Sequence, residues 1–255
     1  MPTATETADL AAMTEALFLK LGGFSRVDPE FRSLFVPACT DVATFEAGEM
    51  MIAKGSAYQS VFLVDAGWVL RARHLPDGGR QIVSVAVADD FVGLNALMFT
   101  TADFDHVCRT PVRAFRFRPA ALRELLTQSP ATAHALFWVS AHEETILAER
   151  IVSLGRRSAV QRAAHVLAEL LARLEIIDAA APPRIAIPIS QEDFADILGV
   201  SSVHANKVLR HLERQEIVTL RKGMLVVHDR AALERVAGFA NGYLHFARRA
   251  DILLD

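Results

Sequence analysis

Cysteine is scarce in this sequence, because only Cys39 and Cys108 occur among its 255 residues. Two thiols cannot build a disulfide scaffold, a four-cysteine zinc site or a cysteine-ligated iron–sulfur cluster within one chain. The chain also lacks an uncharged apolar run of about 18 residues, which a membrane-spanning helix needs. Residues 1–10 carry no Lys or Arg, so they do not resemble the basic start of a signal peptide. We expect a protein of the reducing cytoplasm with no membrane partner.

An excess of charge of one sign is also absent. The chain has 27 Lys and Arg against 30 Asp and Glu, a net charge of −3. This balance excludes a globally basic nucleic-acid coat protein, but it leaves room for a local basic face. The hydrophobic fraction of 52% is that of a folded protein, and the length suits one large domain or two modest ones.

The motifs of common enzymes are missing as well. The sequence has neither a Walker A loop nor a G-x-S-x-G nucleophile motif. His142-Glu143-Glu144 begins like a zinc-protease helix, but Ile146 stands where the second histidine belongs. We therefore expect no catalytic activity, no metal and no cofactor, and we predict that His134, His142 and His165 lie on helix surfaces.

Short apolar or alternating runs, broken by turn residues, extend from about Arg32 to Phe117. The sequence Leu75-Pro76-Asp77-Gly78 is typical of a hairpin tip, because glycine tolerates the positive φ of such turns. Many short strands with Gly-rich turns predict a β-sandwich or barrel. The strand-like runs are residues 60–64, 68–74, 81–87 and 112–117.

Helical patterns flank these strands, with Leu10–Gly22 before them and Pro119–Leu126 after them. Pro130 then fits the first turn of a long helix that follows a Ser129 cap and ends near Leu154. Such a helix packs either on its own copy, which gives a dimer, or on its own sheet, and we favour the dimer. Its apolar residues recur at intervals of three and four residues, and they are Leu136, Val139, Ile146, Leu147, Ile151 and Leu154.

After a helix at residues 158–174 and an Ala/Pro loop at 178–183, the sequence predicts two short helices. Ser190–Asp193 is typical of a helix start, since a serine cap is followed by an acid three residues later. Gly199 ends this helix, and Ser201 or Ser202 caps a second one that runs to about Gln215. A glycine in the turn and a small residue, Ala195, in the first helix favour a helix-turn-helix. The second helix is expected to bury Ala205, Val208, Leu209 and Leu212.

Two β-rich runs follow, at residues 217–220 and 225–227, around the basic turn of Arg221, Lys222 and Gly223. A basic hairpin beside a helix-turn-helix is typical of a wing that contacts phosphates. Residues 185–189 could add a strand in front of it. The segment therefore predicts a winged helix-turn-helix.

Motifs along nearly the whole chain are similar to those of one known family. In the first part they are Phe45–Gly48, Lys54-Gly55, Phe62–Gly67 and Leu75–Gly78, and in the second part Pro188–Ser201 and Val208–Glu213. Together they resemble the Crp/Fnr superfamily of bacterial transcription regulators. The resemblance implies an α+β fold with an N-terminal double-stranded β-helix of the jelly-roll, cyclic-nucleotide-binding type, a long dimerisation helix and a C-terminal winged helix-turn-helix. The expected divisions are a leader and helix at 1–24, the roll at 25–128, the dimerisation helix at 129–155 and the DNA-binding domain at 156–255.

In a helix-turn-helix protein the second helix enters the major groove with its early residues facing the bases. Asn206 is our best candidate for reading a base, because Asn pairs bidentately with adenine, whereas the basic residues are expected on phosphates. The run Ser201–Lys207 departs from the better-known Arg-Glu-Thr-Val-x-Arg pattern, so we do not expect the usual family operator. The full set of predicted DNA contacts is Ser190, Gln191, Ser202, Val203, His204, Asn206, Lys207, Arg210, Arg221 and Lys222. The implied partners are a palindromic double-stranded operator, a second copy of the chain and, as a candidate, RNA polymerase.

Family members that bind cyclic nucleotides carry a Gly-Glu pair followed by Arg-Ser or Arg-Thr. Here Leu94 stands at the Glu position and Phe104-Asp105 at the Arg-Ser position. Because a carboxylate repels a phosphate, we expect no cyclic AMP in the usual pose. Gly93, Leu94 and Asn95 are the candidate contacts of an effector that the sequence does not identify.

Two alternatives stay open at this point. Cys39 or Cys108 could sense oxidants, although a lone cysteine is more often a small buried hydrophobic residue. The chain could also be a ligand-binding or protein-interaction module whose helix pair is structural and never meets DNA. Salt-dependent DNA binding would separate this alternative from a regulator.

Overall fold

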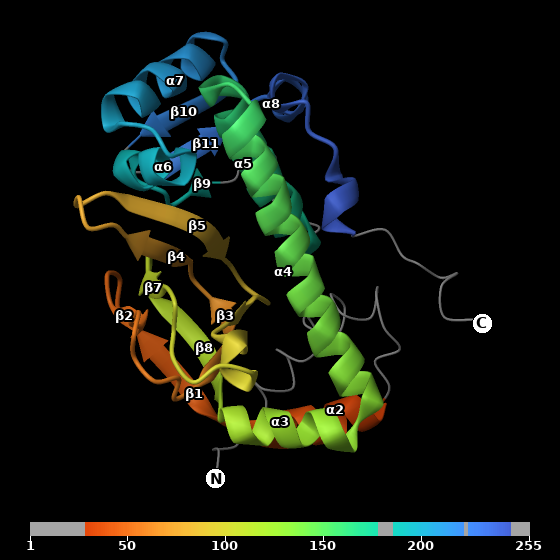
Figure 1. Ribbon diagram of the computed structural model, residues 1–255. Helices are drawn as coiled ribbons and strands as arrows, with labels where there is room; N and C mark the ends of the chain where they lie inside the picture. The colour runs from red at the N-terminus through yellow and green to blue at the C-terminus, as the bar shows by residue number, and fades with distance from the viewer. Residues whose placement is uncertain (1–28, 178–185, 222–223, 246–255) are drawn as a thin grey trace. The chain divides into compact units, whose positions relative to one another are not determined.

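The computed structural model describes residues 29–177, 186–221 and 224–245 (Figure 1). The chain divides into two compact units. In the described part, the N-terminal unit holds the residues up to Leu70 and Ala86–Glu144. The C-terminal unit holds Thr145–Leu244 together with the inserted segment Arg71–Val85. Among the residues described, no helix is both long and apolar enough to cross a membrane.

The described residues before Pro119 contain eight short strands, four of which (β3, β4, β5 and β8) coincide with the predicted runs at residues 60–64, 68–74, 81–87 and 112–117. The strand orders in the two sheets are β1-β8-β3-β6 and β2-β7-β4-β5. Strand β8 pairs antiparallel with both β1 and β3, so that Phe115 lies opposite Val42 on one side and Leu63 on the other. The strands are β1 (Cys39–Phe45), β2 (Met50–Ile52), β3 (Val61–Ala66), β4 (Val69–His74), β5 (Arg80–Ala86), β6 (Phe91–Val92), β7 (Asp105–Cys108) and β8 (Val112–Phe117).

The core of the N-terminal unit fills the space between its sheet and two helices, α2 (Pro29–Ala38) and α3 (Pro119–Gln128). Every residue from Val61 to Val64 is buried, because β3 is an inner strand. Large apolar side chains from the strands and helices exclude water completely and stabilise the unit through their buried area. The fully buried members of this cluster are Phe35, Val61, Leu63, Phe115, Phe117, Leu122 and Ala135.

The beginning of the strand region was predicted wrongly. The strand-like pattern was expected from about Arg32, but residues up to Ala38 form α2, and its Phe35 ring lies 4.9 Å from the ring of Phe117. A short apolar run such as Leu34–Val36 fits a helix as well as a strand, so that periodicity alone does not decide between them. The short 3-10 helix Leu94–Leu97 was also not predicted, and the expected helix at residues 10–22 lies outside the described residues.

The long helix α4 spans Pro130–Arg156, two residues beyond its predicted end. The Ser129 hydroxyl accepts a hydrogen bond from the Thr132 N–H at 3.2 Å, which confirms Ser129 as its cap. After α4 come α5 (Ala159–Ile177), β9 (Ala186–Ile187), α6 (Gln191–Leu198), α7 (Ser202–Arg214), β10 (Val218–Arg221), β11 (Met224–Val227), α8 (Arg230–Ala237) and the 3-10 helix Asn241–Leu244. The predicted Ala/Pro loop at 178–183 lies outside the described residues.

Two of the three helix histidines are buried, so their predicted surface position is wrong. His142 is 8% exposed and stacks on Trp138, while His165 is 3% exposed. His134 is exposed as predicted. A helix flanked by packing elements buries more than one face, and an apolar-spacing pattern does not reveal which polar residues lie on the second face.

His165 belongs to a buried polar network in the C-terminal unit. Glu169, 1% exposed, accepts hydrogen bonds from Arg150 at 3.0 Å and from the Tyr243 hydroxyl at 3.1 Å. The His165 ring lies 3.3 Å from a Glu149 carboxylate oxygen. Burial, with the cation of Arg157, nevertheless lowers the pKa of His165 to about 4, so the ring is neutral at neutral pH.

Candidate nucleic-acid interface

Helix α6 begins as the sequence predicts, with a reciprocal cap. The Ser190 hydroxyl accepts a hydrogen bond from the Asp193 N–H at 3.1 Å, and the Asp193 carboxylate accepts from the Ser190 N–H at 3.2 Å. This is the predicted capping box with Asp in the acidic position. The cap satisfies N–H groups that the first turn leaves without helical partners, so that the start of α6 is fixed.

The turn to the second helix is built on Gly199 and Ser201. Gly199 adopts the left-handed conformation, with φ of +63°, and ends α6. The Ser201 hydroxyl accepts from the His204 N–H at 3.3 Å and caps α7. The small side chain of Ala195 is 1% exposed, as expected where two helices approach closely. The predicted buried side of α7 is confirmed, with Ala205, Val208, Leu209 and Leu212 buried.

The opposite side of α7 is polar and open. Val203 is 67% exposed, and Ser202, His204, Lys207 and Arg210 are also exposed, whereas Asn206 is half-buried. A shallow hollow of about 580 Å³ beside the later turns is lined by Lys207, Arg210, Glu213 and Arg214. Three cations against one carboxylate give this surface a positive potential, which suits an anionic ligand.

The two predicted residues at the start of α6 differ in their surroundings. The Gln191 side-chain amide reaches the Ser202 carbonyl at 3.5 Å, so the sequence-predicted residues at the starts of α6 and α7 lie side by side. The Ser190 hydroxyl is already engaged, because it also donates to the Asp193 carboxylate at 2.6 Å.

The predicted wing is present as a three-stranded antiparallel sheet with strand order β10-β11-β9. Leu225 of β11 lies opposite Leu220 on one side and Ile187 on the other. Arg221 ends β10 opposite Met224, but its side chain is not among the described parts, and Lys222 lies outside the described residues. The described part of the hairpin therefore ends at Arg221 on β10 and begins again at Met224 on β11.

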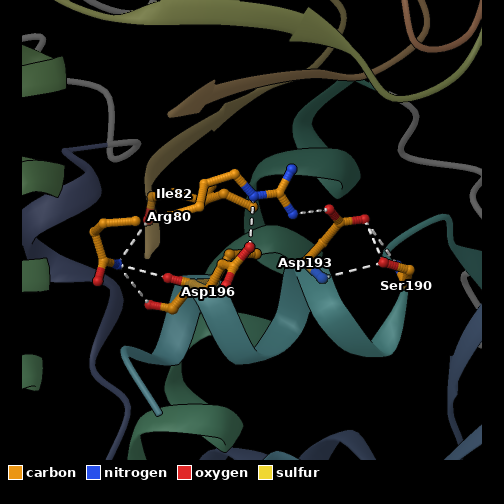
Figure 2. A network of polar contacts seen from close by, with 7 residues as sticks. Arg80, Ile82, Ser190, Asp193 and Asp196 are labelled. Atoms are coloured by element: carbon orange, nitrogen blue, oxygen red, sulfur yellow. Dashed lines mark hydrogen bonds and ion pairs between the residues drawn. The ribbon is translucent and has the colours of Figure 1, made fainter. Parts of the chain in front are cut away.

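Sequence reasoning missed the side chains that hold α6 from outside. Figure 2 shows Arg80, from the start of β5, reaching Asp193 and Asp196 of α6, at 2.7 Å and 2.5 Å. Arg162 of α5 donates to the Leu198 carbonyl at the end of the same helix. No local signal could have revealed these contacts, because more than 110 residues separate Arg80 from its partners.

The candidate effector contacts do not converge. Gly93 and Leu94 are buried, whereas Asn95 is exposed. A Cβ atom at Gly93 would lie 2.7 Å from the Ile52 side chain, so the chain itself fills that space. The Asp105 carboxylate accepts a hydrogen bond from the Lys54 N–H at 2.8 Å. In the described part of the chain, no three His, Cys, Asp or Glu residues gather as metal ligands would.

Both thiols are held in their protonated form. Burial raises the pKa of Cys39 to about 11, and the nearby Asp41 carboxylate acts in the same direction. Burial also raises the pKa of Cys108 to about 11, together with Glu49. Because the thiolate is the reactive species, such thiols react slowly at neutral pH.

Comparison with known proteins identifies both halves of the chain. A sequence profile of the cyclic nucleotide-binding domain matches residues 42–129, and one of the Crp-like helix-turn-helix domain matches residues 161–236. The solved structure of FixK2 from Bradyrhizobium japonicum has the same fold, with a TM-score of 0.70 at 22% identity, and the match covers 78% of this chain and 98% of that one.

Characterised relatives agree with these profiles. The transcriptional activator protein FnrL of Cereibacter sphaeroides is 26% identical over 199 residues, which are 76% of this chain and 79% of the relative. The nitrogen fixation regulation protein FixK of Bradyrhizobium diazoefficiens is 27% identical over 193 residues, 76% of this chain and 80% of the relative. The predicted α+β fold, with its roll, long helix and winged helix-turn-helix, is thus confirmed. The chain belongs to the Crp/Fnr family of DNA-binding transcription regulators.

Proposed function

We propose that the protein acts as a homodimer on a palindromic operator and reads it with α7. The observation that carries this proposal is the face of α7 itself, which is capped at Ser201, buried on one side and exposed on the other. An exposed, polar, positively charged helix at the end of a helix-turn-helix fits the major groove. In this arrangement Asn206 reads a base, Lys207 and Arg210 contact phosphates, and the wing tip with Arg221 and Lys222 meets the backbone of the duplex.

The proposed dimer contact lies along α4. The predicted apolar stripe is divided, because Leu136 and Ile146 are buried within the chain. An exposed stripe shares only Ile151 with the predicted one, and Phe137 and Ile151 on it are 73% and 71% exposed. Its positions alternate in steps of four and three, the spacing of a coiled-coil seam. We define the α4 seam as Phe137, Ala141, Glu144, Ala148, Ile151 and Gly155, all exposed in the single chain.

The chemistry of the α4 seam favours a second copy of the same helix. Small residues at Ala141, Ala148 and Gly155 let two backbones approach, while Phe137 and Ile151 supply apolar area. Glu144 is the single charge on the seam, and one polar position of this kind fixes the register of paired helices. A two-fold dimer would place two copies of α7 on successive major grooves, about 34 Å apart.

We further propose that the roll does not bind cyclic AMP in the usual pose. Leu94 cannot accept a ribose hydroxyl, and the Asp105 carboxylate, which holds the Lys54 N–H, would repel a phosphate. The expected measurement is isothermal titration of the protein with cyclic AMP, which should show no binding and no change in operator affinity. Saturable binding at micromolar concentration would contradict this part of the proposal.

The main experiment is DNA binding by the purified protein as a function of salt. Genomic footprinting first supplies the operator, and labelled duplexes then give affinities for the operator and for random DNA. We expect the affinity to fall steeply with salt, because bound phosphates release counterions, and a half-site duplex to bind far more weakly than the palindrome. A protein that ignores both duplexes at low salt would instead be an interaction module with a structural helix pair. The names of the relatives describe them as regulators. We propose that this protein is also a regulator, that it has no catalytic activity and that it binds DNA in the cytoplasm.

A further inference from the structure

The hairpin of β4 and β5 joins the two halves of the molecule through the chain itself. Strand β4 begins at Val69 and Leu70, which are 1% and 2% exposed and belong to the N-terminal unit. From Arg71 to Val85, however, the hairpin belongs to the C-terminal unit. A hairpin that leaves the N-terminal unit after Leu70 and returns to it at Ala86 therefore belongs, between these residues, with the elements of the C-terminal unit.

Arg80 holds one face of α6 by two charge-assisted hydrogen bonds. Its Nε donates to an Asp196 carboxylate oxygen at 2.5 Å, and one Nη donates to an Asp193 carboxylate oxygen at 2.7 Å (Figure 2). The two acids are three residues apart and so lie on one face of the helix. The side chains of Arg80, Asp193 and Asp196 are 25%, 8% and 19% exposed, so solvent weakens these pairs less than it would on an open surface. The planar guanidinium suits this fork, which a lysine could only half reproduce.

Gln81, the next residue, holds the end of the same helix. Its side-chain amide donates to the carbonyls of Asp196 and Ile197 at 2.7 Å and 3.3 Å. These carbonyls lie in the last turn of α6, where the helix provides no N–H partners of its own. The Gln81 side-chain oxygen also lies 3.2 Å from the position that a Cβ atom of Gly199 would take. The hairpin thus contacts α6 up to the turn that leads into α7.

The far end of β5 is fixed independently. Arg173 of α5, itself 9% exposed, donates to the Val85 carbonyl at 3.0 Å. The hairpin is therefore anchored to α6 at one end of β5 and to α5 at the other.

From this geometry we propose that Arg80 and Gln81 are positioning residues for DNA binding. Through them, the hairpin that begins in the roll holds α6 and its turn in the arrangement that presents α7 to the operator. The contact leaves the reading face of α7 open, with Val203 67% exposed, so it does not block DNA. The inference rests on the proposed role of α7.

The test compares operator affinity in Arg80→Ala, Asp196→Asn and the double variant. We expect Arg80→Ala to lose at least about fivefold in affinity, the lower end of usual coupling between sites. Asp196 is chosen as the partner because Asp193 also belongs to the α6 cap. In the double variant the two losses should not add, since both remove the same contact. The charge exchange Arg80→Asp with Asp196→Arg should recover part of the affinity.

The dependence of operator affinity on salt concentration distinguishes a positioning role from a phosphate contact. Loss of a phosphate contact would change this dependence, whereas loss of a positioning contact would not. We expect the salt slope of Arg80→Ala to equal that of the wild type, because Arg80 contacts carboxylates. Arg118→Ala, which removes the same charge from an exposed position before α3, is the matched control and should bind like the wild type. If circular dichroism shows that Arg80→Ala is unfolded, Arg80→Lys and Asp196→Asn carry the test with smaller losses.

Unchanged affinity, higher affinity or additive losses in the double variant would each overturn the inference. A reduced salt slope in Arg80→Ala would overturn it too, because Arg80 would then be a phosphate contact. These outcomes differ from failure of the proposed function, in which the wild-type protein itself would not bind the operator.

Discussion

At the scale of single residues, sequence selectivity should depend on Asn206. This residue lies on the second turn of α7, half-buried beside the exposed Lys207 and Arg210. Asn206→Ala should reduce the preference for operator over random DNA by about 1–3 kcal/mol, the usual contribution of one bidentate pair with adenine. The measurement is the ratio of the two dissociation constants at one salt concentration.

The matched control for this prediction is Lys207→Ala. Loss of a phosphate contact should weaken operator and random DNA alike and lower the salt slope by about one. If Asn206→Ala behaved in the same way, with equal losses on both duplexes, Asn206 would not be the base reader.

His165 should make stability depend on pH in a defined window. Its pKa is about 4 in the folded chain, against an ordinary value of 6.5. Between these two pH values His165 is protonated in the unfolded chain and neutral in the folded chain. The contribution of His165 to the free energy of unfolding is therefore fully present above pH 6.5 and is lost as the pH falls towards 4. The slope is at most about 1.4 kcal/mol per pH unit.

Urea unfolding of the wild type and of His165→Gln measures this slope. Between pH 6.5 and 5, where few carboxylates titrate, the free energy of unfolding of the variant should no longer fall as the pH is lowered. Parallel curves for the two proteins over this range would show that His165 is protonated inside the fold.

At the scale of elements, the two caps of the helix-turn-helix should differ in strength. Ser190→Ala removes a reciprocal cap in a half-buried position and should destabilise the protein by about 1 kcal/mol or more. Ser201→Ala removes a single hydrogen bond of 3.3 Å at an exposed position and should cost less. Chemical denaturation compares the two variants, and a larger effect of Ser201→Ala would contradict this ranking.

Local rules explain why these elements could be predicted from the sequence. Each of these features depends on residues that are no more than four positions apart in the sequence. They are the caps at Ser190 and Ser201, the turn at Gly199 and the buried side of α7. The limits of prediction appear where distant segments meet. Residues up to Ala38 form a helix whose Phe35 packs against the distant Phe117, and no local pattern contains this contact.

The same limit applies to the candidate site. The polar face of α7 follows from helical spacing, so the sequence alone could nominate Val203, Asn206 and Lys207. The residues that hold α6 could not be nominated, because Arg80 and Gln81 belong to a hairpin far away in the chain. In the sequence, an arginine in a hairpin cannot be distinguished from a solvent-exposed charge, because only the fold brings the two carboxylates close to it.

At the scale of the whole molecule, DNA binding and dimer formation should be lost together. Ile151→Glu places a charge at a 71% exposed apolar position of the α4 seam, where a second copy of the chain would bury it. Burial of an unpaired carboxylate costs several kcal/mol, so the variant should sediment as a monomer of about half the wild-type mass. Since two half-sites bound by one dimer gain from effective concentration, the monomer should also bind the palindrome no better than a single half-site.

Ala120→Glu, which adds the same charge to an exposed position of α3, should remain dimeric and bind the operator normally. Equilibrium sedimentation and titration of the palindromic and half-site duplexes measure both effects on the same samples. A dimeric Ile151→Glu protein with normal affinity would place the contact elsewhere. A monomeric variant with full preference for the palindrome would separate DNA recognition from dimer formation, against the two-fold arrangement in which each copy of α7 depends on its partner for the second groove.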